Sequence, residues 1–198
     1  MSALIDKYKN ILLHDGVVIT ETDTVPAIIC NALSEKAVKK IYNIKQRSSK
    51  KPIAIFCSSI EMAENYLNVD NANSAVLEHL CPGPLTLVLD RLQNNDLAAS
   101  LNINNDSIGL RIPNHKFLLA LIGRLGFPLA ATSANISNEA LELNKIKQTF
   151  SGLVDNIEID ENKNINTTSS IFSINKGKVS MLRDGPISQA TVEDLIKK

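Results

Sequence analysis

The strongest constraint on the fold of this chain is how the spacing of apolar residues changes within the first 46 positions. Apolar side chains recur every three to four residues over 2–14 and again over 35–46, which places them on one face of an amphipathic helix. Between these segments, residues 17–20 read Val-Val-Ile-Thr, a β-branched run typical of a strand. Ser34 is the expected N-cap of the second helix. The chain therefore begins as helix, strand, helix.

The same patterns extend along the rest of the chain. Further strands are expected at 53–57, 85–89, 108–111, 129–132, 154–159, 170–174 and 178–183. Further helices are expected at 59–67, 74–80, 115–123, 139–149 and 190–197. Helices separate many strands in the first two thirds, and adjacent strands near the end favour antiparallel additions. We therefore expect a mixed α/β sheet in one domain, with loops at the Asn-rich stretches 91–106 and 160–168.

Length, composition and charge exclude several classes of protein. The chain has 198 residues, of which 44% are hydrophobic and 21% are charged, and this composition is globular rather than disordered. A chain of this length buries roughly 70% of its unfolded surface, so its core needs no metal or disulfide. Its 21 basic residues balance 21 acidic ones. Because the formal net charge is +0, we do not expect the protein to coat nucleic acid or a membrane by bulk charge.

Cysteine usage and the apolar segments indicate the compartment. Cys30, Cys57 and Cys81 are far apart, odd in number and without a CxxC pair, so we expect reduced, buried thiols. The N-terminal segment has no apolar core and does not resemble a signal peptide. The longest apolar stretch, 117–132, is interrupted by an arginine and a proline, so no membrane span is expected. These features predict a soluble, cytoplasmic protein.

Several well-known catalytic motifs are missing from the sequence. It has no GxxxxGK[ST] phosphate loop, no GxGxxG turn after the first strand and no GxSxG nucleophile elbow. Its three histidines lack metal-ligand spacing with one another or with cysteine. Hydride transfer, P-loop NTPase chemistry, serine hydrolysis and zinc chemistry therefore have no direct support, and we expect no metal-binding residues.

Two polar clusters lie in the first quarter of the chain. Thr20–Pro26 reads TETDTVP directly after the first strand, and Lys45–Pro52 reads KQRSSKKP at the end of the second helix. Each has an ordinary structural explanation, as a turn capped by its own side chains and as cations that complement a helix dipole. Alternatively, the hydroxyl groups hold a ligand and the cations converge on phosphate groups.

Two further clusters follow predicted strands. Ser107–Pro113 places Arg111 among apolar neighbours, where a charge is costly to bury unless it is paired. Arg111 therefore either forms an internal salt bridge or binds a substrate carboxylate. Residues 128–135 read PLAATSAN, an apolar strand that runs into small hydroxyl side chains and an amide. This segment is either an Asx/Ser turn or a place where the backbone approaches a nucleotide closely.

Taken together and in this order, the clusters resemble those of the YrdC/TsaC family of threonylcarbamoyl-AMP synthases. The family pattern has a Thr-x-Thr-Val strand end, a Lys-x-Arg loop, Pro-Gly-Pro-x-Thr-x-Val, Arg-Ile-Pro, Thr-Ser-Ala-Asn, a Ser-Thr-Ile strand and a late Arg-x-Gly. The matching segments here are Thr22–Val25, Lys45–Arg47, Pro82–Val88, Arg111–Pro113, Thr132–Asn135, Ser169–Ile171 and Arg183–Gly185. No single motif is specific, but seven in the right order over about residues 10–187 are.

The resemblance implies a fold and a reaction. The implied fold is one YrdC-like α/β domain over 1–198, a twisted mixed β-sheet with flanking helices and a positively charged concave groove. The implied reaction is a nucleotidyl transfer that converts L-threonine, bicarbonate and ATP into threonylcarbamoyl-AMP and pyrophosphate. Partner proteins would use this product for N6-threonylcarbamoyladenosine modification next to the anticodon of tRNA, and weak direct tRNA binding is also expected. Mg²⁺ would accompany ATP, held mainly by the oxygens of ATP.

The resemblance also assigns roles to individual residues. Arg111 would pair with the threonine carboxylate, while hydroxyl groups of Thr24, Ser133 and Ser169 would hydrogen-bond the polar groups of threonine. Lys45 and Arg47 would be catalytic through positioning and charge stabilisation, without an identified general base. The ATP-binding residues would be Lys45, Arg47, Lys51, Ser107, Asn135 and Arg183.

The chain departs from the family pattern at several positions. Pro26 and Ala27 stand where Tyr-Gly is usual, and Phe56 stands where some members place a ligand-contacting histidine. Contacts made by those side chains are therefore not carried over. The retained Lys-x-Arg and Ser-Ala-Asn favour an active synthase over the YciO-like paralogues, in which such motifs are altered.

Two other functions are compatible with these motifs. One is an RNA-binding module of the same fold without nucleotide chemistry, and the other is a related carbamoyl-adenylate enzyme with a different acceptor. The balanced charge and the 4% aromatic content weigh against strong RNA binding. Arg111 together with Thr24 and Ser169 favours an amino-acid acceptor.

Overall fold

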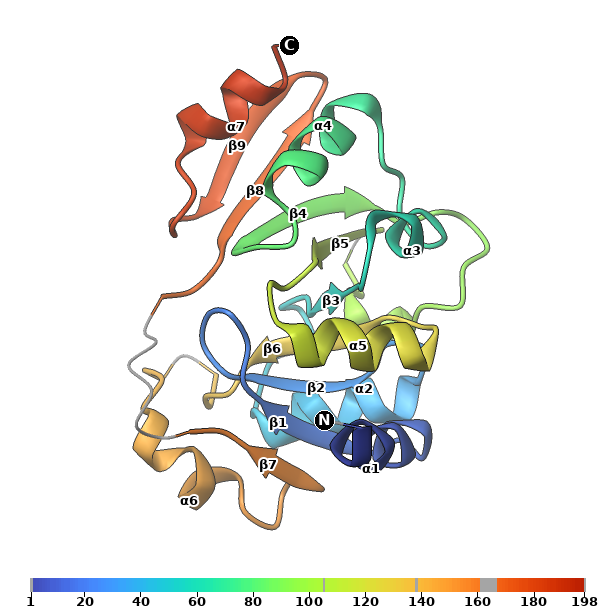
Figure 1. Ribbon diagram of the computed structural model, residues 1–198, viewed down its shortest axis with the longest axis vertical. Helices are drawn as coiled ribbons and strands as arrows, with labels where there is room; N and C mark the ends of the chain where they lie inside the picture. Colours follow the sequence, from blue (N-terminus) through green and yellow to red (C-terminus); the bar gives the residue numbers. More distant parts are fainter. Residues whose placement is uncertain (1, 105, 138, 161–166, 198) are drawn as a thin grey trace.

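The computed structural model describes residues 2–104, 106–137, 139–160 and 167–197. These residues form a nine-stranded mixed sheet with helices packed against it (Figure 1). Across the sheet, the strands are β7 (Asn156–Glu158), β1 (Val17–Thr20), β2 (Ala27–Asn31), β6 (Leu129–Ser133), β3 (Ala54–Phe56), β5 (Ser107–Arg111), β4 (Leu85–Asp90), β8 (Ser170–Asn175) and β9 (Lys178–Arg183). The expectation of a mixed α/β sheet with flanking helices is confirmed.

The helices mostly lie where the apolar periodicity places them. They are α1 (Ser2–Leu13), α2 (Glu35–Ile44), α3 (Ile60–Glu64), α4 (Asn71–Leu80), α5 (Lys116–Leu125), α6 (Ile146–Phe150) and α7 (Gln189–Leu195), with 3-10 turns η1 (Ala99–Leu101) and η2 (Leu143–Lys145). Ser34 caps α2 as expected, because its Oγ accepts a hydrogen bond from the backbone N–H of Ala37 at 3.1 Å. The cap fixes the start of α2, and the helix ends directly before Lys45.

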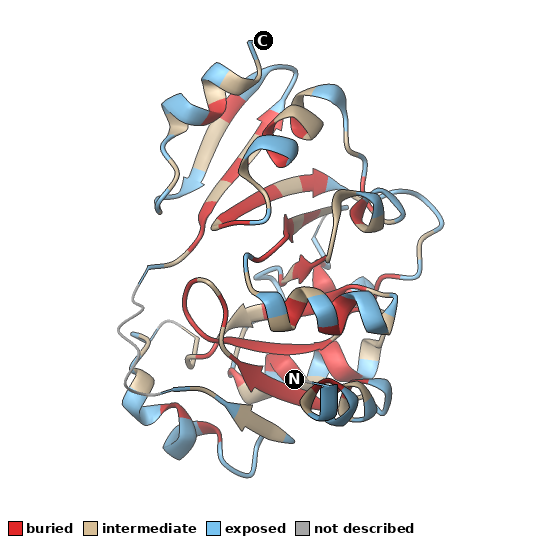
Figure 2. Ribbon diagram, in the orientation of Figure 1, coloured by how far each residue is buried: buried red, intermediate tan, exposed pale blue. Residues whose placement is uncertain are grey.

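Strand alternation divides the core into two layers. In β1, Val17 and Ile19 point to one face of the sheet and Val18 points to the other. The second face is covered by α1 and α5, which pack against each other and against β1, β2, β3 and β6 (Figure 1). Helix α2 covers β2 from the first face. The buried residues therefore lie along the strands, and the exposed ones lie on the outer sides of the helices (Figure 2).

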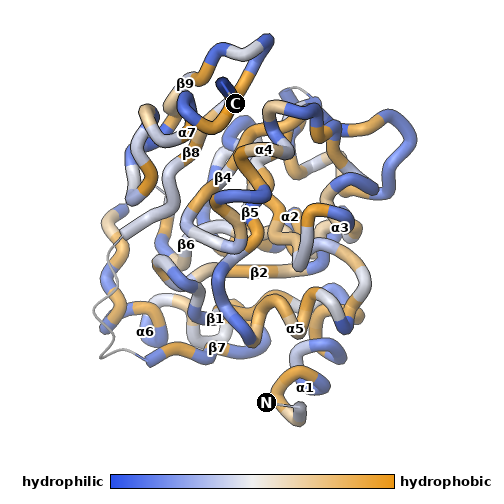
Figure 3. The backbone as a smooth tube through the Cα atoms, turned by 45° about the horizontal axis from the view of Figure 1, so that its top comes forward, coloured by the Kyte–Doolittle hydropathy of each residue, from blue (hydrophilic) through white to orange (hydrophobic). Residues whose placement is uncertain are grey.

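The far end of the sheet is built around the β8–β9 hairpin. β9 pairs antiparallel with β8, and α7 packs against both β9 and α4. β4 joins this end to the centre of the sheet, since it pairs parallel with β8 and antiparallel with β5. In Figure 3 the central strands consist mostly of hydrophobic residues, whereas the outer loops are mostly hydrophilic.

The structure corrects several expectations about the elements. β2 was not predicted, because Pro26 and the polar turn before it obscure the short apolar run that follows. The expectation of antiparallel additions near the end holds for the pairing of β8 with β9 and is wrong for β7, which pairs parallel with β1, and for β8 against β4, which is also parallel. The helix expected at 139–149 is shorter, formed by η2 and α6. η1 lies within the loop expected at 91–106, and most of the loop expected at 160–168 falls outside the described residues.

The cysteines are free thiols in the core. Cys30 and Cys57 are buried, and Cys81 is half-buried. Burial raises the pKa of Cys57 to about 12 and that of Cys81 to about 11. Thiols that resist ionisation are poor nucleophiles, which agrees with the expectation of reduced, buried thiols. Among the described residues, no helix is both long and apolar enough to cross a lipid bilayer.

The segment after β9 packs tightly onto the start of β8, and this contact gives a test of the fold. A Cβ on Gly185 would lie 2.5 Å from the backbone nitrogen of Ser170 and 2.8 Å from the carbonyl oxygen of Thr168. Because both obstacles are backbone atoms, we expect Gly185→Ala to lower the free energy of unfolding in urea by about 1–3 kcal/mol.

Gly123 in α5 offers the matched control. A Cβ there would meet no atom within 4 Å. Gly123→Ala should therefore raise the free energy of unfolding by about 0.5–1 kcal/mol, because alanine loses less backbone entropy in a helix than glycine does. Equal effects of the two substitutions would contradict the packing described for Gly185.

Candidate functional site

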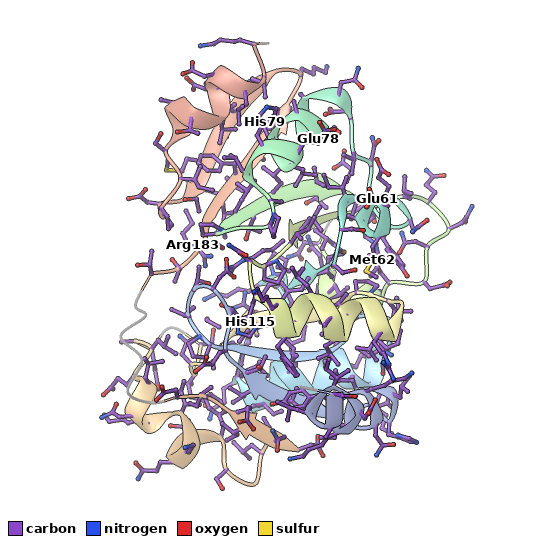
Figure 4. All side chains as sticks on the ribbon, in the orientation of Figure 1. Glu61, Met62, Glu78, His79, His115 and Arg183 are labelled. Atoms are coloured by element: carbon purple, nitrogen blue, oxygen red, sulfur yellow. The ribbon has the colours of Figure 1, made fainter. Side chains whose placement is uncertain are left out.

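One cavity gathers six of the ten residues singled out from the sequence. It has a volume of about 180 Å³ and lies over the sheet between the β1–β2 loop and the β8–β9 end. The six residues come from six separate segments: Thr24, Arg47, Arg111, Ser133, Ser169 and Arg183. Figure 4 labels Arg183, which is the last residue of β9. The fold thus brings together residues that are up to about 160 positions apart in the sequence.

Small side chains leave room for this cavity. Ala27 of β2, Ala131 of β6 and Ala54 of β3 all line it. Ala27 and Ala131 project from the face covered elsewhere by α1 and α5, as does Phe56, which also lines the cavity. Since each alanine carries only one carbon beyond the backbone, a ligand can approach the sheet closely there. Phe56 supplies an apolar wall.

Arg111 is buried and fully oriented. Its residue is 5% exposed, and its Nη2 donates to Oδ1 of Asp23 at 2.7 Å. Its Nη1 donates to Oγ1 of Thr24 at 2.7 Å, and its Nε donates to the carbonyl oxygen of Gly83 at 3.4 Å. The guanidinium carbon lies 5.5 Å from the centre of the Phe56 ring. The internal salt bridge considered for Arg111 is therefore present.

This salt bridge leaves some N–H donors of the Arg111 guanidinium available. Three of its five N–H donors are occupied by the described residues, so two remain for a ligand in the cavity that Arg111 lines. Burial lowers the pKa of Arg111, while the charge of Asp23 raises it. An arginine keeps its charge under these conditions, so Arg111 can both pair internally and bind a carboxylate.

Two further arginines line the same cavity. Arg47 donates from Nη2 to the carbonyl oxygen of Pro52 at 2.9 Å, and Arg183 donates from Nε to the carbonyl oxygen of Ser169 at 2.9 Å. Arg183 also donates from Nη2 to Oγ of Ser169 at 2.8 Å. Burial lowers the pKa of both guanidinium groups. Both side chains are held in place by neutral oxygens, so their positive charges stay available to an anionic ligand.

Hydroxyl groups complete the lining. Thr24 is fixed by Thr22, whose Oγ1 accepts from the backbone N–H of Thr24 at 2.9 Å. Ser169 is fixed by Thr86, because their hydroxyl oxygens lie 2.8 Å apart. All four side chains belong to buried residues. The hydroxyl groups are thus held in defined positions beside the arginines.

Lys45 is not among the described residues that line the cavity, but it contacts Ser133, which is. The residue is 1% exposed, and its Nζ donates to the carbonyl oxygens of Ser133 and Asn135 and to Oδ1 of Asn135. Its own carbonyl oxygen accepts from the backbone N–H of Ser137 at 3.0 Å. Lys45 thus ties the end of α2 to the turn after β6. Burial, with a smaller contribution from Arg47, lowers the pKa of Lys45 to about 7.

The remaining predicted residues lie around the cavity. Asn135 lines a neighbouring cavity of about 50 Å³ next to α6, and its Nδ2 donates to the carbonyl oxygen of Glu139 at 2.6 Å. Lys51 is an exposed residue whose carbonyl oxygen accepts from Nε of Arg47 at 3.2 Å. Ser107 begins β5, roughly 13 Å along the strand from Arg111. In the described part of the chain, neither Lys51 nor Ser107 lines the main cavity.

Sequence reasoning missed two residues that support the site. Asp23 pairs with Arg111, and Thr86 holds Ser169. Asp23 lies between two threonines of the predicted ligand-binding turn, so its position in that motif was an available signal. Thr86 lies in the Pro-Gly-Pro-x-Thr segment, to which no role was assigned. Among the described residues, no three His, Cys, Asp or Glu side chains cluster in a way that could hold a metal ion.

The chain is similar to proteins of one family along most of its length. The family model Sua5_yciO_yrdC, described as "Telomere recombination", matches residues 10–185. A putative threonylcarbamoyl-AMP synthase from Methanocaldococcus jannaschii is 34% identical over 185 residues, covering 90% of this chain and 84% of that protein. A threonylcarbamoyl-AMP synthase from Mus musculus is 39% identical over 128 residues, covering 65% of this chain. The match spans 45% of the mouse protein, less than half of its length.

A solved structure agrees with these sequence matches. The crystal structure of P. abyssi Sua5 complexed with L-threonine has a TM-score of 0.89 and 27% sequence identity to this chain. The match covers 97% of this chain and 57% of the P. abyssi chain. The described fold is thus that of a protein which binds L-threonine.

The lowered pKa of Lys45 predicts a pH dependence of stability. The lysine binds its proton more weakly in the folded protein than in the unfolded chain, so the unfolded chain holds more protons above about pH 7. The free energy of unfolding therefore rises with pH between about 7 and 10, and this contribution of Lys45 is absent below pH 7. We expect the unfolding free energy of wild type, minus that of Lys45→Met, to increase by up to about 1.4 kcal/mol per pH unit.

Urea unfolding between pH 7 and 8.5 measures this difference, and the ionisation of unfolded cysteines cancels because both proteins carry the same three. Lys50→Met removes an exposed lysine from the same segment and serves as the control. A constant difference between wild type and Lys45→Met across this range would contradict the account, because it would mean that Lys45 stays protonated throughout.

Proposed function

Because the chain belongs to the Sua5/YciO/YrdC family, we propose that it is a threonylcarbamoyl-AMP synthase, a nucleotidyltransferase that uses L-threonine, bicarbonate and ATP. The observation that carries this proposal is the single cavity where Arg111, with two free N–H donors, lies beside Arg47 and Arg183. Three arginines on one cavity can bind a carboxylate and phosphate groups, because guanidinium groups pair well with both. The M. jannaschii relative with the same named activity, aligned over most of both chains, supports it.

The proposed reaction has two steps. The threonine amine and bicarbonate first form a carbamate with loss of water. A carbamate oxygen then attacks the α-phosphorus of ATP, a new O–P bond forms, and the bond to the β-phosphate breaks with release of pyrophosphate. The carbamate is already an anion, so this second step needs no general base. Catalysis would rest on positioning and on stabilising the charge that develops on the phosphates.

Each role follows from the chemistry of the side chain. Arg111 would bind the threonine carboxylate through its two remaining N–H groups, next to the hydroxyl groups of Thr24 and Ser169. Arg47 and Arg183 would neutralise the phosphates. Ser133 would contact threonine from the end of β6.

The residues outside the main cavity would act on the nucleotide in other ways. Lys45 would support the phosphate site from beneath, since it holds the turn formed by Ser133 and Asn135. Asn135, Lys51 and Ser107 would contribute along the path of the nucleotide outside the cavity. The described lining contains arginines and hydroxyl groups without a carboxylate, so Mg²⁺ would enter on the phosphate oxygens of ATP.

The cellular role follows from the product. We propose that 1–198 acts as one YrdC-like domain with a positively charged groove in the cytoplasm. Partner proteins would transfer the threonylcarbamoyl group to the adenosine next to the anticodon of tRNA, to which this chain would bind weakly at most. An RNA-binding module without nucleotide chemistry is the second candidate, but the net charge of +0 is a poor basis for RNA affinity.

Pyrophosphate release tests the proposed reaction. We expect release from ATP to require both L-threonine and bicarbonate, and to fall to background when either is left out. A phosphate-coupled assay with the purified full chain measures it. Release that is independent of threonine would refute the synthase, and the absence of any release, combined with RNA binding, would favour the RNA-binding module.

The division of labour among the arginines has its own test. We expect Arg111→Ala to raise the KM for threonine by at least about tenfold, and by more than it raises the KM for ATP, because it removes the carboxylate partner. Arg47→Ala and Arg183→Ala should show the reverse pattern. Arg124→Ala, an exposed arginine on α5 that contacts Asp6, is the control. Equal effects of all three cavity variants on both substrates would contradict this assignment.

A further inference from the structure

The three cavity arginines differ in how their charges are compensated. Arg111 is paired with the carboxylate of Asp23 at 2.7 Å. Arg47 donates to backbone carbonyl oxygens, and Arg183 donates to the carbonyl and hydroxyl oxygens of Ser169. Among the described residues, no carboxylate lies within ion-pair distance of Arg47 or Arg183. The cavity therefore contains one neutralised arginine and two that keep their full charge.

Among the described residues, Arg111 is the one ion-pair partner of Asp23. Its side chain is 13% exposed, and its Oδ2 is buried with no hydrogen-bond partner among the described residues. In the part of the chain that the structure describes, Asp23 is not among the residues that line the cavity. A carboxylate that is largely withdrawn from water and has one oxygen without a hydrogen bond is costly, so the pairing with Arg111 is favoured. Asp23 therefore acts on any ligand through Arg111.

We propose that Asp23 is a positioning residue that keeps phosphate groups away from Arg111, so that carboxylate and polyphosphate bind to different arginines of one cavity. A polyphosphate carries several negative charges, so its affinity for a site depends strongly on the net charge there. The Arg111–Asp23 pair has a net charge near zero, so its electrostatic attraction for a polyphosphate is weak. It still presents two N–H donors, and a planar carboxylate with a single charge can use both.

Such a separation matters because the amino acid and the nucleotide must occupy the cavity at the same time. The inference rests on the proposed function, since it assigns the carboxylate to the amino-acid substrate. Three fully charged arginines in a cavity of about 180 Å³ would form one polyanion site, and ATP or pyrophosphate would compete with the amino acid for it. With Arg111 neutralised, the phosphates go to Arg47 and Arg183. The amino-acid position then stays open while the nucleotide is bound.

Asp23→Asn is the direct test, because asparagine keeps the size of the side chain and removes its charge. Isothermal titration measures the affinities for L-threonine and for inorganic pyrophosphate, each alone and with the other at saturation. We expect wild type to bind both together. In Asp23→Asn, pyrophosphate should bind about tenfold tighter, as expected for one added charge near the site, and it should displace L-threonine.

Asp184→Asn is the matched control. Asp184 follows Arg183 in the chain, and its carboxylate is exposed and accepts from the backbone N–H of Gly185. The substitution changes the net charge of the protein by the same amount as Asp23→Asn. We expect it to leave both affinities and the simultaneous binding unchanged. An equal gain in pyrophosphate affinity in both variants would overturn the inference, because it would show an effect of overall charge.

A pair of variants covers the case in which Asp23→Asn does not fold. Arg111→Gln alone leaves the Asp23 charge behind, whereas Arg111→Gln combined with Asp23→Asn removes both charges. We expect the double variant to bind pyrophosphate about tenfold tighter than Arg111→Gln. Equal affinities of these two variants would overturn the inference, since Asp23 would then have no influence on phosphate.

The outcomes separate this inference from the proposed function. If wild type does not bind L-threonine, the proposed function fails, and the change in pyrophosphate affinity alone decides the role of Asp23. If wild type binds L-threonine but Asp23→Asn changes neither the pyrophosphate affinity nor the competition, the inference fails and the proposed function stands.

Discussion

The site depends on one buried ion pair, the contact of Arg111 with Asp23. Arg111 comes from the end of β5 and Asp23 from the β1–β2 loop, so the pair joins the middle of the sheet to the loop that closes the cavity. Removing either partner would leave the other charge unpaired and largely withdrawn from water, which costs about 3–5 kcal/mol. Once the pair has formed, Thr24 lies directly against the guanidinium. One electrostatic requirement thus sets the positions of the carboxylate-binding group and of the loop beside it.

The other basic side chains of the site are held by neutral oxygen atoms. Arg183 is held by Ser169, which in turn contacts Thr86. Lys45 joins α2 to the turn after β6 through carbonyl oxygens. These contacts orient cations without neutralising them. Arg47 and Arg183 thus line the cavity without an ion-pair partner among the described residues, in a chain whose net charge is +0.

Much of the fold was predictable because apolar spacing reports burial directly. α1, α2, β1 and β9 lie where their patterns place them, and Ser34 caps α2 as predicted. β2 was missed because a strand of five residues after a proline has too little alternation to be recognised. The parallel pairing of β7 with β1 was also beyond reach, since it joins segments about 140 residues apart and local patterns carry no information on such pairing.

The site was predictable as a set of residue types and less so as a geometry. The order of motifs identified six residues that line one cavity, including Arg111 and Arg183. It did not reveal that Asp23 neutralises Arg111. Whether Arg111 forms an internal salt bridge or binds only a substrate carboxylate depends on which carboxylate the fold brings near it. The most direct test of the account is a crystal structure of this chain with L-threonine and a non-hydrolysable ATP analogue. The account predicts the threonine carboxylate on Arg111 and the phosphates on Arg47 and Arg183; phosphates on Arg111, with threonine elsewhere, would contradict it.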